Sequence, residues 1–234
     1  MRPILLLVIM GLGGGCGGSG SPAKQDAPSS PSDGAPDTPA ASNFSFFITS
    51  SGIPNGGDFR RTAADADGLA GADEFCRTKA AAAVPASANR QWRAYLSTTT
   101  VNAKDRIGTG PWFNHNGVMI AASVAALHDP ASNLINKANG LDETGAMVPG
   151  KNDNPNQHDI LTGSTTAGIS SGNNCSNWTN SAATGTTAQV GHFDRIGGGT
   201  DPMSWNAAHA TNGCSAAAFV TTGGRGSIYC FAAD

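Results

Sequence analysis

Four cysteines in the C-terminal two thirds of this 234-residue chain limit what it can fold into more than any other feature of the sequence. They are Cys76, Cys175, Cys214 and Cys230, at successive spacings of 99, 39 and 16 residues. No Cys-x-x-Cys pair occurs, and the spacings match no zinc module. An even number of cysteines in an exported chain favours two disulfides, and three pairings are open from the sequence alone. A bridge between the outer two would close most of the domain, with the inner two nested inside.

The N-terminus indicates that the chain is exported. Arg2 precedes an unbroken apolar stretch at residues 4–10, which Leu12, several glycines and Cys16 follow. A positive start, an apolar core and small residues make up a secretory signal peptide, predicted here at residues 1–15. The stretch is too short to span a bilayer as a helix. A cysteine directly after small residues resembles the bacterial lipoprotein signal, in which the chain is cut before the cysteine and that cysteine carries lipid.

The signal differs from the usual lipoprotein pattern at one position. Leucine usually stands three residues before the cysteine, whereas Leu12 stands four residues before Cys16 and Gly13 takes the usual place. An ordinary signal peptide with an incidental Cys16 is the alternative. An odd thiol in a secreted chain needs an explanation, and this favours lipidation.

Residues 16–43 predict a flexible, lipid-anchored linker. They are mostly Gly, Ser, Pro, Ala and Asp, with Lys24 as the single basic residue. Such a segment buries too little apolar surface to offset the entropy of ordering. As a coil it reaches about 25–30 Å. Residues 44–234 then form one domain, and we expect a protein held by its lipid in the bacterial cell envelope, at the outer membrane or cell surface.

The charge of the domain argues against nucleic acid as a partner. Residues 44–234 carry 12 Lys plus Arg and 14 Asp plus Glu, and no basic cluster is longer than Arg60-Arg61. A basic patch is the first requirement for binding a polyanion. We therefore expect weak or no binding to nucleic acids or heparin-like polymers.

Hydrophobic periodicity predicts an irregular α+β domain with a mostly antiparallel sheet, two short helices and long loops. The expected helices are residues 67–83, ended by Pro85, and residues 101–107. A turn at Asn116-Gly117 should join two extended pieces. The strand candidates are residues 44–50, 92–96, 160–161, 175–179, the surroundings of Trp205, 216–220 and 228–231.

No catalytic motif appears, and we expect a protein that is not an enzyme. The five histidines show no metal-binding spacing, so each is expected in an ordinary core or surface role. A Gly-x-Ser-x-Gly nucleophile motif does not occur.

Asp153 and Asp159, in and beside an Asn-rich stretch, are candidate calcium ligands because Ca²⁺ takes oxygen donors. Asp142 and Glu143 are expected to anchor the long loop by hydrogen bonds. The four tryptophans are expected mostly in the core.

An ordered set of segments resembles the endostatin fold, a variant of the C-type-lectin-like fold, in its bacterial surface-lipoprotein version. The resemblance covers residues 44–234. The segments are Gly68-Leu69-Ala70-Gly71-Ala72-Asp73 before Cys76, Trp92-Arg93-Ala94-Tyr95-Leu96-Ser97, Asp105-Arg106-Ile107, Leu141-Asp142-Glu143, Leu161-Thr162-Gly163-Ser164, Cys175-Ser176-Asn177-Trp178-Thr179, Cys214, and Ile228-Tyr229-Cys230-Phe231.

The resemblance implies two nested disulfides, Cys76–Cys230 and Cys175–Cys214. It also implies a non-catalytic binding or adhesion module that contacts a macromolecular ligand, protein or glycan, at the cell surface. A calcium- or glycan-binding lectin is the alternative, and an unrecognised hydrolase is a third. The N-terminal histidines that hold zinc in endostatin have no counterpart here, so the resemblance does not imply a zinc site in this chain. Recognition is expected in the loops at residues 108–158 and 185–204.

The lipid anchor can be tested directly. Cys16→Ser should move the protein from the membrane fraction to the soluble exported fraction, because the residue that carries the lipid is gone. Unchanged fractionation of this variant would favour an ordinary signal peptide.

Overall fold

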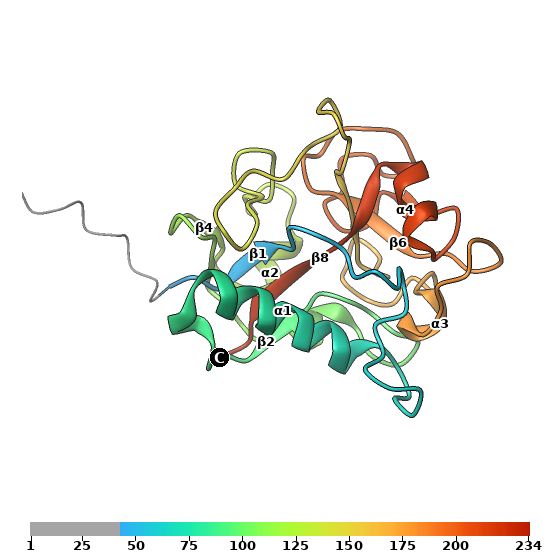
Figure 1. Cartoon of the computed structure of the whole chain (residues 1–234). Coiled ribbons are helices and arrows are strands. Elements are labelled where there is room, and N and C mark those ends of the chain that lie inside the picture. The colour runs from blue at the N-terminus through green and yellow to red at the C-terminus, as the bar shows by residue number, and fades with distance from the viewer. Residues whose placement is uncertain (1–42) are drawn as a thin grey trace, which may run out of the picture. The chain divides into compact units, whose positions relative to one another are not determined.

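One long strand near the C-terminus, β8 (Gly224–Ala232), organises the sheet in the computed structural model, which describes residues 43–234 (Figure 1). The signal peptide, Cys16 and almost all of the predicted linker lie outside the described residues. Strand β1 (Phe46–Ile48) pairs antiparallel with one edge of β8. Strand β2 (Trp92–Ala94), antiparallel, and strand β5 (Asp159–Leu161), parallel, share the other edge. Three strands from different parts of the domain therefore pair directly with β8.

The sheet continues from β5 into β6 (Gln189–His192) and β7 (His209–Ala210), both joined by antiparallel pairing. These elements make an α+β fold with a mostly antiparallel sheet. The remaining elements are α1 (Leu69–Ala83), the 3-10 turns η1 (Pro85–Ser87) and η2 (Ala103–Asp105), the two-stranded sheet of β3 (Trp112–Phe113) and β4 (Met119–Ala121), and the helices α2 (Val124–His128), α3 (Cys175–Trp178) and α4 (Ala216–Thr222).

Strand β8 carries two hydrophobic cores because successive side chains of a strand point to opposite faces. Ile228 and Cys230 belong to the core on one face, and Tyr229 and Phe231 to the core on the other. All four are fully buried. The second core includes Trp112 and Trp205, and the long loops lie over it. All four tryptophans of the chain are buried, as expected.

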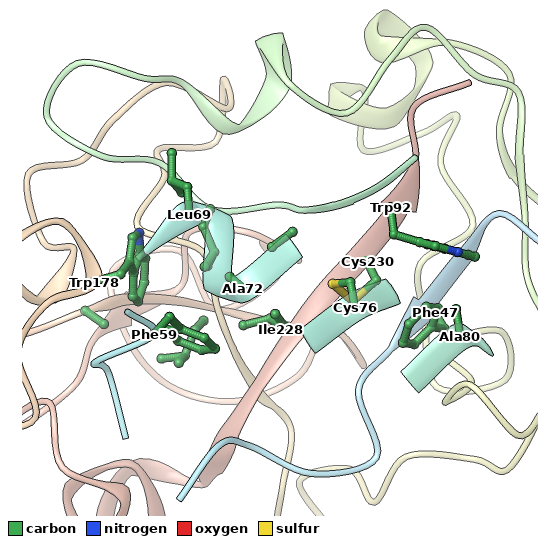
Figure 2. Packing of buried hydrophobic residues seen from close by; sticks show 14 of the residues in the cluster. Phe47, Phe59, Leu69, Ala72, Cys76, Ala80, Trp92, Trp178, Ile228 and Cys230 are labelled. Atoms are coloured by element: carbon green, nitrogen blue, oxygen red, sulfur yellow. A yellow bond between two sulfur atoms is a disulfide. The ribbon is translucent and has the colours of Figure 1, made fainter. Parts of the chain in front are cut away.

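Helix α1 covers the first core with one face (Figure 2). Leu69, Ala72, Cys76 and Ala80 recur at helical spacing, and all are buried. Cys76 forms a disulfide with Cys230 of β8, which ties the first helix to the last strand. The helix ends just before Pro85, because the residue that precedes a proline disfavours the helical conformation.

A buried carboxylate adds a polar link between α1 and β2. Asp73 accepts hydrogen bonds from the backbone N–H of Ala94 at 2.9 Å, from Arg93 at 3.0 Å and from Arg106 at 2.9 Å. Two guanidinium groups and a backbone donor compensate its desolvation. The link holds β2 in place beside the disulfide.

The second disulfide, Cys175–Cys214, closes a loop of 39 residues inside the 154-residue loop of the first. This is the nested pairing that the resemblance implies. The predicted helix at residues 67–83, the strands around residues 46–48, 92–94 and 228–231, and the turn at Asn116-Gly117 are also present. Gly117 has a φ of 74°, a conformation that favours glycine.

The expectation of two short helices was wrong: the described residues contain four α-helices. Residues 216–220, predicted as a strand, belong to α4. Ser215 caps this helix by accepting a hydrogen bond from Ala218 N at 3.1 Å, and Gly223 ends it with a φ of 109°. The capping residues favour a helix more strongly than the short apolar run favours a strand. Of the two large apolar side chains in the run, Phe219 is buried, whereas Val220 is 65% exposed. The expected helix at residues 101–107 is only the 3-10 turn η2.

Helix α3 replaces another predicted strand, at residues 175–179, and its backbone is left-handed. Cys175, Ser176, Asn177 and Trp178 have φ values of 49°, 55°, 61° and 62°. For residues with a Cβ this conformation costs about 1–2 kcal/mol each. Tertiary interactions hold it in place: the Cys175–Cys214 disulfide, and a 2.8 Å hydrogen bond from the buried Trp178 indole to Ser97 O.

Removing the Cβ from an exposed residue of this turn should stabilise the protein. Ser176→Gly is expected to raise the free energy of unfolding by about 1 kcal/mol, because glycine adopts positive φ without penalty. Urea unfolding measures the change. Ser176→Ala is the matched control, since it also loses the hydroxyl but keeps the Cβ; an equal gain in both variants would contradict the backbone explanation.

The two disulfides should contribute unequally to stability. Loop entropy assigns about 5 kcal/mol to the 154-residue loop and about 4 kcal/mol to the 39-residue loop, as upper values. The Cys76→Ala/Cys230→Ala variant should therefore lose more free energy of unfolding in guanidinium than Cys175→Ala/Cys214→Ala. The reverse order would show that the inner bridge does more than close a loop.

Candidate functional site: a histidine–aspartate cluster beside a loop-lined pocket

Three histidines and one aspartate meet at one end of strands β5, β6 and β7. Asp159 begins β5 and lies directly opposite His192, the last residue of β6, in the antiparallel register. His158 precedes Asp159, and His209 begins β7. The side chains of His158, Asp159 and His192 are each only 1% exposed, and that of His209 is 22% exposed. These four residues are called the His–Asp cluster below.

The imidazole Nε2 atoms of the cluster all face the Asp159 carboxylate. His158 Nε2 lies 3.2 Å and His192 Nε2 3.3 Å from Asp159 Oδ1, while His209 Nε2 lies 3.5 Å from Oδ2. None of these contacts has hydrogen-bond geometry. Both carboxylate oxygens and His192 Nε2 are buried without a hydrogen-bond partner among the described residues.

The opposite nitrogen of each ring is bound to an acceptor. His158 Nδ1 lies 3.1 Å from Asp194 Oδ1, His192 Nδ1 lies 3.0 Å from Pro202 O, and His209 Nδ1 lies 3.0 Å from Ala210 O. A carbonyl or carboxylate oxygen only accepts, so each Nδ1 carries the proton. In the neutral ring Nε2 then carries a lone pair and lies beside the Asp159 carboxylate.

The carboxylate of the cluster is ionised at neutral pH. Burial raises the pKa of Asp159, but the adjacent imidazoles of His192 and His209 outweigh burial and hold the pKa at about 2. The lowering comes from rings that present a proton to the carboxylate, as they do when both ring nitrogens are protonated. In return, Asp159 raises the pKa of His209.

Glycines let the loop after β6 close over the cluster. A Cβ at Gly197 would lie 2.6 Å from the His192 ring and 3.0 Å from the His158 ring, and Gly197 has a φ of 142°. A Cβ at Gly199 would lie 3.1 Å from His209. The close approach of this backbone therefore depends on the absence of side chains.

A cavity of about 380 Å³ lies between two loop segments. One wall comes from residues 128–136 and the other from residues 195–206, with Thr166 between them. Both segments fall largely in the loops where recognition is expected. Arg195 joins the walls, since its Nε donates to Ile135 O at 2.6 Å and an Nη donates to the Asn133 side chain.

A chain of hydrogen bonds joins two lining residues of this pocket, His128 and Asn206, through the buried Tyr95. Asn206 Nδ2 donates to Tyr95 Oη at 3.0 Å, and Tyr95 Oη lies 2.7 Å from His128 Nε2. Burial raises the pKa of the Tyr95 hydroxyl and lowers that of His128, so a neutral hydroxyl donates to a neutral ring. His128 Nδ1 in turn lies 2.8 Å from Val124 O.

The pocket and the His–Asp cluster share one stretch of backbone. His192 bonds to Pro202 through its ring, and its N–H donates to Ser204 O at 2.9 Å. Asp194, which accepts from His158, also accepts from Lys151 N at 2.7 Å. Residues 192–206 thus support both sites.

The predicted calcium ligands belong to different groups in the structure. Asp153 forms an ion pair with Lys137 and accepts from Gly150 N at 2.7 Å, whereas Asp159 faces the three histidines. Asp142 and Glu143 anchor the long loop as expected. Asp142 accepts from Thr144 N at 2.9 Å, and Glu143 accepts from Ser50 N at 2.9 Å and pairs with Lys79 at 3.1 Å.

Sequence analysis missed the His–Asp cluster. The expectation of ordinary roles fits His115, whose Nδ1 lies 3.0 Å from Glu143 O, but it overlooks the convergence of His158, His192 and His209. Those three lie on different segments, so no local spacing could reveal them. The one available signal was the adjacency of His158 and Asp159 at a predicted buried strand.

Comparison with protein-family models and with curated protein sequences finds no match to this chain. Among the residues that the structure describes, no helix is both long and apolar enough to cross a bilayer.

Proposed function

We propose that this protein is a lipid-anchored module of the bacterial cell envelope that binds a macromolecular ligand without catalysis. The observation that carries the proposal is the pocket between residues 128–136 and 195–206, in which two loops far apart in sequence form one concave site. Concave sites built from loops on a rigid scaffold are where proteins usually place recognition.

The scaffold under the pocket is well suited to that role. The lining residue Trp205 is buried in the second core with Tyr95, which hydrogen-bonds to Asn206. Tyr229 of β8 donates to Trp205 O at 2.7 Å. Ser204 Oγ donates to the Asn206 side chain at 2.9 Å. A site fixed in this way loses little conformational freedom on binding.

The groups around the pocket favour a ligand rich in hydroxyl and amide groups. Asn133, Asn136 and Arg195 contribute amide and guanidinium groups, Asp201 a carboxylate, and Met203 an apolar contact that is 59% exposed. This mixture of donors and acceptors matches a glycan segment better than a polyanion, since Arg195 is the only Lys or Arg of the lining. Glycan recognition is therefore the ligand class we favour.

The finer fold assignment is part of the same proposal. An endostatin-like variant of the C-type-lectin-like fold is supported by the nested disulfides and by the attachment of the first helix to the last strand. The apolar run and Cys16 at the N-terminus support the lipid anchor. An experimental structure superposed on endostatin would test the fold, and the Cys16→Ser fractionation tests the anchor.

Two side chains at the pocket rim should be needed for binding. Asp201→Ala/Met203→Ala in the purified protein is expected to weaken binding to immobilised oligosaccharides at least tenfold, because it removes an acceptor and an apolar contact. A glycan array identifies a bound oligosaccharide, and surface plasmon resonance then measures its affinity.

The matched control is Asp105→Ala/Met147→Ala, which removes the same two side-chain types from exposed positions outside the pocket. It should bind like the unaltered protein. Equal binding by both double variants would place the contact surface elsewhere, and no binding by the unaltered protein to any oligosaccharide would contradict glycan recognition.

A further inference from the structure

We propose that His158, Asp159, His192 and His209 form a binding site for one divalent transition-metal ion, with Zn²⁺ as the best-fitting ion. The site goes beyond the ligand pocket, and its occupation does not require a ligand there. Four features of the cluster lead to this assignment.

The first feature is a set of buried polar atoms with no partner. Asp159 Oδ1, Asp159 Oδ2 and His192 Nε2 have no hydrogen bond among the described residues, although each is buried. Buried carboxylates are ordinarily paired or bound to a metal, because an isolated charge is costly in a low-dielectric interior. A single cation between these atoms would compensate all three.

The second feature is the orientation of the rings. Each histidine donates its Nδ1 proton to Asp194, Pro202 O or Ala210 O, which leaves Nε2 as a lone pair. Metal-bound histidines almost always have such an acceptor behind the ring, because it fixes both the tautomer and the ring orientation. Three neutral rings with Nε2 lone pairs beside a carboxylate offer it no donor, and a positive charge between them would stabilise all four groups.

The third feature is the spacing of the donor atoms. Tetrahedral zinc with ligands at about 2.0–2.1 Å places neighbouring donor atoms about 3.3 Å apart. The nitrogen–oxygen separations in the cluster are 3.2, 3.3 and 3.5 Å. The donor atoms of His158, Asp159 and His192 all lie within 4.8 Å of one another, and His209 approaches from the more exposed side.

The fourth feature is the chemistry of the donors. Three imidazoles and one carboxylate suit Zn²⁺, whereas Ca²⁺ and Mg²⁺ require sets of oxygen ligands. No thiol competes in the described domain, because its four cysteines form disulfides. His158, Asp159 and His192 supply three ligands, and His209 Nε2, 3.5 Å from Asp159 Oδ2, is the nearest protein group for the fourth position.

Proton sharing is the competing explanation. A proton on His209 would form an ion pair with Asp159, but it would leave His192 Nε2 without a partner. A metal ion satisfies every donor in the cluster. It would also join β5, β6 and β7 and, through Pro202 and Asp194, hold the loop that closes over the cluster.

Titration of the metal-free purified protein with Zn²⁺ tests the proposal. We expect isothermal calorimetry to show one ion bound per chain and the melting temperature to rise on its addition. Co²⁺ bound in place of Zn²⁺ should give the intense visible absorption of a four-coordinate ion. Ca²⁺ should produce none of these effects. Absence of stoichiometric Zn²⁺ binding would overturn the proposal.

Variants of the cluster assign the ligands. Asp159→Asn should abolish stoichiometric binding and the Zn²⁺-dependent rise in melting temperature, and His209→Gln should weaken binding at least tenfold. His115→Gln is the control, since that histidine lies outside the cluster. Circular dichroism shows whether each variant folds, and His209→Gln is the safer variant because its side chain is partly exposed. Unchanged affinity in folded His209→Gln and Asp159→Asn proteins would show that zinc binds elsewhere.

Discussion

The bond between Cys76 and Cys230 holds together the two parts of the chain on which the sheet is built. Cys230 lies in the middle of the part of β8 that pairs with β1 on one edge and β2 on the other. The disulfide fixes α1 across this strand, and Asp73 on the same helix binds the backbone of β2. A strand that close to the C-terminus would fray without such a link. With β8 fixed, β5 can pair with it and extend the sheet toward β6 and β7.

That extension creates the end of the domain that holds the candidate site. Pairing of β5 with β6 sets Asp159 opposite His192, and β7 brings His209 to the same carboxylate. The residues that follow β6 then turn back over the cluster and become one wall of the pocket. A metal ion bound in the proposed site would order this wall, and metal binding and ligand binding would then be coupled through residues 192–206. The coupling would favour ligand binding, because less loop entropy is lost when the wall is already ordered.

Local patterns predicted the elements that depend on local physics. Helix α1 shows its buried face every three or four residues and ends before Pro85, and the hairpin has its Asn-Gly turn. The predicted strand at residues 175–179 was wrong because the disulfide and the buried Trp178 hold a left-handed turn that the backbone alone would disfavour. The predicted strand at residues 216–220 was wrong because the capping residues Ser215 and Gly223 outweigh a short apolar run.

The sequence by itself indicated two disulfides, a helix at residues 67–83 and a strand at residues 228–231, because cysteine number and hydrophobic period are local properties. Tertiary structure alone decided which side chains meet. His158, His192 and His209 belong to three segments, and only strand pairing brings their Nε2 atoms to within 3.5 Å of the Asp159 carboxylate. The register of a sheet depends on contacts between distant residues, so the candidate metal centre has no signature along the chain beyond the adjacent His158 and Asp159.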